Sequence, residues 1–267
     1  MTPALLRARL EATLGDRFPA ALGLGERPAP DLVSTGVAEI DALTAGLPRG
    51  ALTEICGPAS SGRTSLLLAA LAEATRREEA CALVDAGDAF DPHSAAAAGV
   101  ELSRLLWVRC NNPMARWSDD PIRITRSPDR PITQSLEQAL RAADLLLQAG
   151  GFGLVALDLG DVPPALARRV PLTSWFRFRR AVERTPTVLL LVEQEPCAKT
   201  CASLVLRLQP SAVSFQPSAK HSEEGSSPTH GCLLSSHSIR VEVLRSRIAQ
   251  NKHSTTRADF QTQAVWA

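Results

Sequence analysis

A short stretch in the first third of the chain has the residue types and spacing of a phosphate-binding loop. Residues 57–65 read GPASSGRTS, which fits G-x-x-x-x-G-[KR]-[ST] with Arg63 where lysine is usual. Backbone N–H groups of such a loop cradle phosphate oxygens, and a hydroxyl such as that of Thr64 binds Mg²⁺. The alternative is an ordinary Gly/Ser turn leading into a helix. The predicted nucleotide-binding residues are Gly57, Pro58, Ala59, Ser60, Ser61, Gly62, Arg63, Thr64 and Ser65.

A carboxylate at the end of a distant apolar segment could complete a magnesium site. Asp158 closes the segment LVALD, roughly 95 residues after the loop, where a Walker-B aspartate organises the metal and its waters. Many strands end in aspartate, so this residue gains its weight from the loop upstream. We predict that Thr64 and Asp158 hold Mg²⁺ through a bound nucleotide.

The elements that must position these residues alternate in type. Apolar runs at 51–56, 80–86, 104–110, 153–159 and 187–194 read as strands, and segments 64–79, 133–150 and 172–184 read as helices. Nearly continuous apolar strands separated by helices are typical of a parallel sheet that is covered on both faces. The sequence therefore predicts an α/β fold: a mostly parallel, twisted sheet with helices on both faces, preceded by an N-terminal helix.

The chain divides into segments of different composition. Residues 1–33 read as an N-terminal helix and a Pro/Gly-rich linker that could serve as an oligomerisation arm. Residues 34–209 form the predicted core, with an insertion at 111–131 that carries four prolines. We expect a flexible polar loop at 210–238 and the last core strand or strands with a tail at 239–267.

The overall composition excludes a globally basic or membrane-spanning protein. The 267 residues are 45% hydrophobic and carry a formal net charge of +1, so any nucleic-acid contact must come from local clusters. No apolar run has the ~18–20 residues needed to span a bilayer, and the amphipathic N-terminus is unlike a signal peptide. We expect a cytoplasmic protein with no membrane partner.

The six cysteines do not form a recognisable metal motif in the sequence. Cys197 and Cys201, followed by His221, His230 and Cys232, have a spacing that fits no common zinc pattern. Cysteines in or beside apolar runs more often behave as small buried hydrophobes.

Several motifs, in the same order along the chain, resemble the RecA recombinases. They are STGVAEIDALTAGLPRGALTEICGPASSGRTSL (34–66), CALVDAGDAFDP (81–92), EQAL (137–140), LLLVEQ (189–194), VEVLRSRIA (241–249) and ADFQ (258–261). The resemblance implies the P-loop NTPase core of the RecA/RadA superfamily, with ATP and Mg²⁺ as cofactors. It also implies that Gln194 is the phosphate-sensing glutamine. The C-terminal domain of that family has no counterpart in this sequence.

Where the chain departs from the family, catalytic residues are affected. The family's water-activating glutamate corresponds to Gly87, and the adjacent Asp88 is shorter and shifted by one position. Its adenine-stacking tyrosine corresponds to Ser94, next to His93. The Arg63 guanidinium is bulkier than a lysine ammonium and cannot act as a compact charge between phosphates. The resemblance thus implies ATP binding with impaired hydrolysis, with Asp88 and Gln194 as the remaining catalytic candidates.

Two basic groups are candidates for contacts with DNA or a neighbouring subunit. Arg245 and Arg247 match a basic pair that reaches across the filament interface in the family; alternatively, they protect a sheet edge. The second group lies in an aromatic- and arginine-rich segment, 164–184, where it could contact DNA phosphates or simply extend from an amphipathic helix. Its members are Arg168, Arg169, Arg177 and Arg180.

Three functions follow from these patterns. The first is a short, divergent RecA-like protein of DNA repair and the SOS response, similar to accessory proteins of translesion synthesis. It would bind single-stranded DNA, RecA or a translesion polymerase, and could form a homo-oligomer. The second is an active DNA-dependent ATPase and strand-exchange recombinase. The third is a nucleotide-free interaction scaffold in a translesion-polymerase complex.

Overall fold

The structure is a computed structural model of residues 1–267, and it describes residues 30–110, 130–211, 236–247 and 257–263. Within it, Asp31–Ala267 form one compact unit. Most of the predicted N-terminal helix and linker, the insertion and the polar loop lie outside the described residues.

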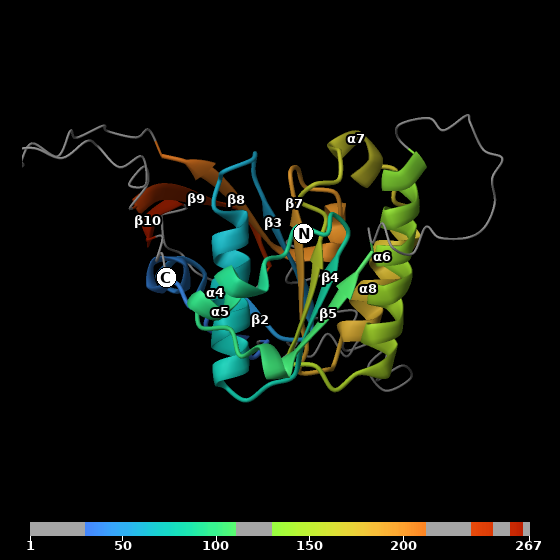
Figure 1. The fold of residues 1–267 in the computed structure, drawn as a ribbon, viewed down its shortest axis with the longest axis horizontal. Helices are drawn as coiled ribbons and strands as arrows, with labels where there is room; N and C mark the ends of the chain where they lie inside the picture. Colours follow the sequence, from blue (N-terminus) through green and yellow to red (C-terminus); the bar gives the residue numbers. More distant parts are fainter. Residues whose placement is uncertain (1–29, 111–129, 212–235, 248–256, 264–267) are drawn as a thin grey trace, which may run out of the picture. The chain divides into compact units, whose positions relative to one another are not determined.

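The centre of the unit is an eight-stranded sheet with the order β10-β9-β8-β3-β7-β6-β4-β5 (Figure 1). Its strands are β3 (Ala51–Cys56), β4 (Cys81–Asp85), β5 (Leu105–Arg109), β6 (Leu154–Asp158), β7 (Val188–Glu193), β8 (Ala202–Pro210), β9 (Ser236–Ser246) and β10 (Arg257–Gln263). Pairs from β8 through β5 are parallel, whereas β9 and β10 add antiparallel strands at one edge. A small second sheet pairs β1 (Leu32–Val33) with β2 (Leu47–Pro48).

Helices cover both faces of the sheet, as the sequence predicts (Figure 1). The helices are α3 (Ala38–Thr44), α4 (Arg63–Arg76), α5 (Pro92–Ala97), α6 (Arg130–Ala149), α7 (Pro164–Ala167) and α8 (Leu172–Val182). The described residues also include the 3₁₀ turns η1 (Leu102–Arg104) and η3 (Lys199–Cys201). The mostly parallel α/β architecture is therefore confirmed.

The core consists of two apolar clusters, one on each side of the sheet. On one side α6 and α8 pack against the sheet, with Trp175 and Phe178 of α8 in edge-to-face contact. On the other side Leu66, Leu67 and Leu71 of α4 are buried against β3, β4 and β6. Because the central strands are buried on both faces, their sequences are continuous apolar runs instead of alternating ones.

The edges of several predicted segments differ from the structure, and strand pairing explains why. Both ends of the polar loop predicted at 210–238 belong to strands. Pro210 of β8 pairs with Ile239, and Ser236 of β9 pairs with Gln263. Val33, assigned to the linker, pairs with Leu47 in the small sheet. The insertion predicted to end at 131 gives up its last two residues to α6, which starts at Arg130. Such ladder and helix ends are set by partners far away in the sequence.

Candidate nucleotide-binding site

The predicted phosphate loop connects the carboxyl end of β3 to the start of α4. β3 ends at Cys56 and α4 begins at Arg63, so the loop N–H groups lie at the N-terminus of a fourteen-residue helix. The positive end of a helix favours an anion there. The loop is therefore placed where a phosphate group would gain from both features.

Two glycines of the loop are required by close packing. A Cβ on Gly57 would lie 2.3 Å from the carbonyl oxygen of Leu208 and 2.6 Å from the hydroxyl of Ser61. Gly62, at φ 86°, would place a Cβ 2.0 Å from the Ile239 side chain. Ser60 also adopts a left-handed conformation, with φ 59°. The loop backbone thus lies directly against the antiparallel part of the sheet, which holds its N–H groups in place.

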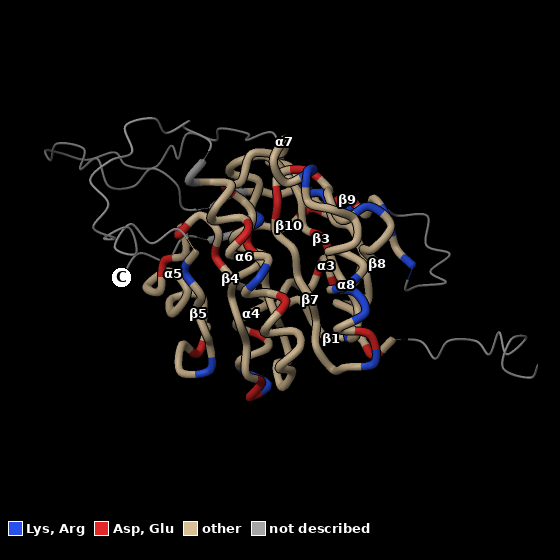
Figure 2. The backbone as a smooth tube through the Cα atoms, turned by 90° about the vertical axis from the view of Figure 1, so that its right-hand side faces the viewer, with Lys and Arg blue, Asp and Glu red and all other residues tan. Residues whose placement is uncertain are grey.

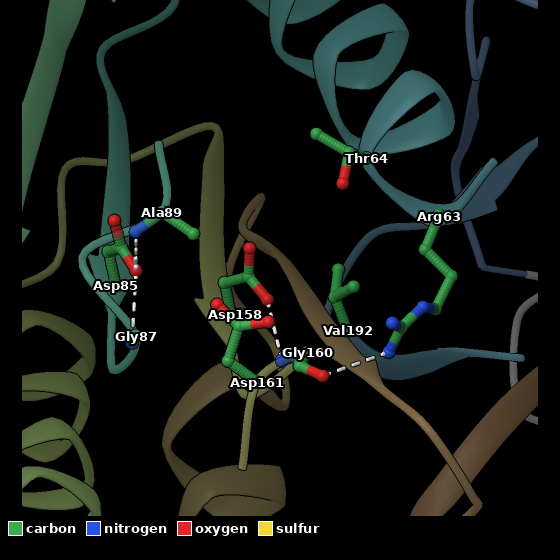
Figure 3. A pocket seen from close by; sticks show the side chains of 9 residues that line it. All are labelled: Arg63, Thr64, Asp85, Gly87, Ala89, Asp158, Gly160, Asp161 and Val192. Atoms are coloured by element: carbon green, nitrogen blue, oxygen red, sulfur yellow. Dashed lines mark hydrogen bonds between the residues drawn. The ribbon is translucent and has the colours of Figure 1, made fainter. Parts of the chain in front are cut away.

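A small polar pocket of about 60 Å³ opens beside this loop, at the carboxyl ends of the parallel strands. It brings together the predicted Arg63, Thr64 and Asp158 (Figure 3). The full lining is Arg63, Thr64, Asp85, Gly87, Ala89, Asp158, Gly160, Asp161 and Val192. In an open parallel sheet this edge is the usual place for a ligand.

The two aspartates at the strand ends are neighbours because of the sheet register. Asp85 of β4 is directly opposite Asp158 of β6 in the parallel ladder. Burial of its carboxyl group, with the nearby acids, raises the pKa of Asp158 to about 6, although the Gly160 N–H and the Arg63 charge favour its ionised form. Asp158 accepts a 2.8 Å hydrogen bond from that N–H. A cation bound here would favour the ionised carboxylate.

Arg63 reaches across the pocket toward the loop that follows β6 (Figure 3). Its Nη1 donates to the Gly160 carbonyl oxygen at 3.4 Å, and Gln194 Nε2 donates to the same oxygen at 3.1 Å. Gln194 also donates to the Val162 carbonyl at 3.3 Å. Gln194 does not line the pocket itself. It instead connects the end of β7 to the loop after Asp158, so these two segments are coupled.

Asp85 shapes the turn that contains Gly87. Its carboxylate accepts from the backbone N–H groups of Gly87 at 3.1 Å, Ala89 at 3.3 Å and Phe90 at 3.0 Å. Trp107 Nε1 donates to it at 3.3 Å. This buried carboxylate therefore holds the segment 87–90 in a fixed conformation at the pocket wall.

The space beside Gly87 is taken by another acid. A Cβ built on Gly87 would lie 2.6 Å from Asp161 Oδ2 and 3.0 Å from Asp161 Cβ. Asp161 comes from the loop after β6 and borders the same pocket (Figure 3). A carboxylate is thus present next to the position of the missing glutamate, but it comes from a different strand end.

Asp88, the predicted substitute for that glutamate, is not among the pocket-lining residues. Its carboxylate accepts hydrogen bonds from Nε and Nη2 of Arg109, at 2.6 and 2.8 Å. This hydrogen-bonded ion pair lowers the pKa of Asp88 below its ordinary value. A general base works best with a pKa near the operating pH, so the pairing makes Asp88 a poor base. The expectation that Asp88 could replace the glutamate is not supported by this geometry.

At the position of the family's stacking tyrosine, the structure shows a helix cap. Asp91 caps the short helix α5 by accepting from the backbone N–H groups of His93 and Ser94 and from the Ser94 hydroxyl. Neither His93 nor Ser94 belongs to the pocket lining. The local sequence here serves the helix start, and Ser94 itself supplies no aromatic surface for a base.

The basic candidates of the segment 164–184 lie on α8 and near α7, and all four are exposed. Figure 2 shows basic positions along α8. Arg168 pairs with Glu195, and Arg177 pairs with Asp144 of α6 at 2.8 Å. Arg169 and Arg180 form no ion pair with any described residue. Trp175 and Phe178 are buried in the core, as the amphipathic-helix interpretation expects, whereas the third aromatic residue, Phe176, is 42% exposed.

Arg245 lies near the end of β9 and Arg247 directly after it, both beyond the part of β9 that pairs with β10. Arg245 is opposite Val205 of β8 and donates to the carbonyl of Lys199, and the Arg247 N–H donates to Ser203 at 2.8 Å. Since β10 pairs only as far as Glu242, the edge of this part of β9 is not covered by a described strand. Both interpretations made from the sequence, interface contact and edge protection, remain predictions.

Besides the apolar Ala89 and Val192, sequence reasoning missed three pocket residues: Asp85, Gly160 and Asp161. A signal existed for each, since Asp85 ends an apolar run as Asp158 does, and Gly160 and Asp161 follow within three residues of Asp158. What the sequence lacks is the register that sets Asp85 opposite Asp158 and turns Asp161 toward Gly87.

Among the described residues, no helix is both long and apolar enough to cross a membrane.

Comparisons with known proteins identify relatives of this chain. Residues 6–113, which include the phosphate loop, match the family model of the RecA N-terminal domain. The chain is 32% identical over 189 residues to Protein RecA of Gluconacetobacter polyoxogenes, covering 64% of this chain and 48% of that protein. It is 30% identical over 203 residues to Protein RecA of Ectopseudomonas oleovorans, covering 70% and 52%.

A third relative, Protein RecA of Rickettsia massiliae, is 29% identical over 205 residues. The chain spans about half the length of the curated relatives it matches. These relatives align over roughly two thirds of the chain, and the family model covers the phosphate loop within the parallel sheet. The chain belongs to the RecA/RadA superfamily.

Proposed function

We propose that this chain is a RecA-like accessory protein of DNA repair that holds ATP with Mg²⁺ and hydrolyses it slowly or not at all. The observation that carries the proposal is at the pocket wall. Gly87 occupies the place of the family's water-activating glutamate, and the neighbouring Asp88 is bound to Arg109. The phosphate cradle is thus kept while the segment that should supply the base offers none.

The residues present fit a nucleotide phosphate with its magnesium. The cradle at 57–64 is closed to any side chain at Gly57 or Gly62, so backbone N–H groups can approach a ligand. Thr64 and Asp158 would hold Mg²⁺, which when bound neutralises phosphate charge. Asp158 would hold it as the ionised carboxylate, and the Gly160 N–H supports that form.

Slow hydrolysis follows from the positions of the side chains. General-base assistance is typically worth about 10²–10⁴ in rate, and Gly87 provides none of it. The Arg63 guanidinium is directed to the Gly160 carbonyl, at 3.4 Å, on the far side of the pocket. A bulky, planar group held there is a poor substitute for a compact ammonium between phosphates.

The partner class follows from the superfamily and from the exposed arginines. The relatives are RecA proteins, and we propose single-stranded DNA, RecA itself or a translesion polymerase as the partner in an SOS-type response. Arg169 and Arg180, which pair with no described acid, are the best candidates for phosphate contacts on this chain. A homo-oligomer through the N-terminal segment is part of the same proposal.

The test measures binding and hydrolysis separately on the full chain. Fluorescent ATP with Mg²⁺ is titrated against wild type, Thr64→Val and Asp158→Ala, and phosphate release is followed with and without single-stranded DNA. We expect saturable binding that both substitutions weaken at least tenfold, and phosphate release close to the protein-free background. Thr173→Val, the same change at an exposed threonine of α8 outside the pocket lining, is the matched control and should bind as wild type does.

Two outcomes would replace the proposal by its alternatives. DNA-stimulated phosphate release that Asp158→Ala abolishes would identify an active DNA-dependent ATPase and recombinase. Absence of binding at millimolar ATP in the wild type would identify a nucleotide-free interaction scaffold instead.

A further inference from the structure

A second group of chemically active side chains lies on the sheet face opposite the phosphate loop. Glu54 of β3, Glu193 at the end of β7 and Cys197 of the following turn are 0%, 1% and 3% exposed. Strand alternation places Glu54 on the same face as Leu52 and Cys56, which belong to the apolar cluster under α6 and α8. This group shares no residue with the nucleotide pocket.

The backbone satisfies only half of the two carboxyl groups. The N–H of Cys197 donates to Oε1 of Glu54 at 2.9 Å and to Oε1 of Glu193 at 3.0 Å, and the N–H of Ala198 donates to the Glu54 oxygen at 2.5 Å. Oε2 of Glu54 and Oε2 of Glu193 are fully buried and accept a hydrogen bond from no described donor. Two polar atoms inside an apolar cluster are therefore left to be satisfied by something else.

The electrostatics of the two adjacent carboxyl groups also favour a bound cation. Burial and the adjacent Glu54 raise the pKa of Glu193 well above its ordinary value, whereas the Cys197 hydrogen bonds lower it. Two carboxylates cannot both be ionised side by side in an apolar environment unless a cation joins them.

The donor set and its spacing indicate which cation fits. One carboxylate oxygen from each glutamate and the Cys197 sulfur lie within 4.8 Å of one another. Zinc is bound by carboxylate oxygens at about 2.0–2.2 Å and by thiolate sulfur at about 2.3 Å, so atoms at this spacing can surround one ion. Magnesium and calcium prefer oxygen ligands alone, and a thiolate disfavours them.

We propose that Glu54, Glu193 and Cys197 form a buried site for Zn²⁺. Three protein ligands leave the fourth tetrahedral position to a water molecule. The ion would join three segments: β3, which leads into the phosphate loop, β7, which leads to Gln194, and the turn at 197–201. Binding displaces the thiol proton and any proton held by the carboxyl pair.

The experiment uses the untagged full chain, expressed in zinc-supplemented medium and purified without chelators. Metal content is measured by mass spectrometry for wild type, Cys197→Ser and the nearly isosteric Glu193→Gln. Cys81→Ser, at an equally buried cysteine on the other sheet face, is the matched control. We expect about one Zn²⁺ per chain in wild type and control and at least a fivefold loss in the two site variants.

A second measurement does not depend on the folding of any variant. Wild type is stripped with a chelator and titrated with Co²⁺ alone, which should give a thiolate-to-metal charge-transfer band, and its melting temperature should fall on stripping and recover with ZnCl₂. A wild-type chain without zinc, without the cobalt band and with an unchanged melting temperature would overturn the proposal. In that case the two carboxyl groups share a proton. Zinc retained in full by Cys197→Ser and Glu193→Gln would equally overturn it.

Discussion

Single residues around the pocket decide between holding and cleaving a nucleotide. Gly87 leaves the wall without a side chain, and Asp161 occupies the space beside it, 2.6 Å from where a Cβ would be. The Asp88 carboxylate is paired with Arg109 outside the pocket lining, and the Arg63 guanidinium donates to the Gly160 carbonyl. The absence of a base at position 87 and the presence of the Asp161 carboxylate are therefore linked, because Asp161 occupies the space that a side chain at position 87 would need.

The first prediction concerns the restoration of hydrolysis. Gly87→Glu combined with Arg63→Lys should stay inactive, because the new side chain meets Asp161 and sets two carboxylates side by side. Adding Asp161→Ala clears that space, and we expect at least a tenfold rise in ATP turnover, measured by phosphate release. Adding Asp158→Ala to this triple variant is the control and should abolish the gain. Equal turnover with and without Asp161→Ala would show that Asp161 is not the obstacle.

The second prediction uses the raised pKa of Asp158. A carboxyl group with a pKa of about 6 when folded, against 3.8 ordinarily, destabilises the fold once it is ionised. The penalty is complete above pH 6 and shrinks as the pH falls toward 3.8. Asp158→Asn should therefore raise the free energy of unfolding by about 2 to 3 kcal/mol at pH 7.5 and by about half as much at pH 5, in urea titrations without nucleotide. A gain that does not depend on pH would contradict this origin.

At the scale of elements, the candidate functional residues lie at the carboxyl ends of the parallel strands. β4 and β6 end in Asp85 and Asp158, β3 ends at the phosphate loop, and β7 ends at Glu193 and Gln194. The two sheet faces separate these groups, since the nucleotide pocket is beside α4 and the glutamate–cysteine cluster is on the side of α8. Helix α8 adds an exposed basic surface to this second side.

The third prediction tests that basic surface. Arg169→Glu with Arg180→Glu should weaken single-stranded DNA binding at least tenfold. The slope of the logarithm of the binding constant against the logarithm of the salt concentration should fall in magnitude by about one per arginine, as expected for lost phosphate contacts. Fluorescence anisotropy at several salt concentrations measures both effects. The double variant Arg76→Glu with Arg104→Glu changes the same charge on the other side and should bind DNA normally. Equal loss in both double variants would indicate a general charge effect.

At the scale of the whole molecule, Asp31–Ala267 form one compact unit with an apolar cluster on each side of the sheet. A sheet buried on both faces needs nothing outside this unit to cover its strands. We therefore expect the folding of this unit to be separable from any oligomerisation through residues 1–33.

The fourth prediction follows from that separation. A chain that starts at Asp31 should unfold cooperatively, with a melting temperature within about 5 °C of the full chain, because both clusters are intact. If the N-terminal segment is the oligomerisation arm, sedimentation should show that the shortened chain has lost the larger species. An unfolded or aggregated product would contradict the assignment of an independent unit.

The main elements could be predicted from the sequence because they are coded locally. Continuous apolar runs give the buried strands, and helical periodicity gives α4, α6 and α8 to within a few residues. The helix α3 and the two-residue strands β1 and β2 were not predicted, since such short segments depend on distant partners: Leu32 pairs with Pro48, and Thr44 is buried. Local pattern is insufficient where tertiary contacts supply the stability.

The sequence by itself determined the phosphate loop, the Asp158 position and the family, because a loop between a strand and a helix is encoded in consecutive residues. Only the tertiary structure decided that Asp88 pairs with Arg109 and that Asp161 faces Gly87. It also brought Glu54 and Glu193, far apart in the sequence, to one buried point. The physical reason is register: which side chains meet across a sheet depends on strand order and pairing, and residue spacing along the chain does not contain that information.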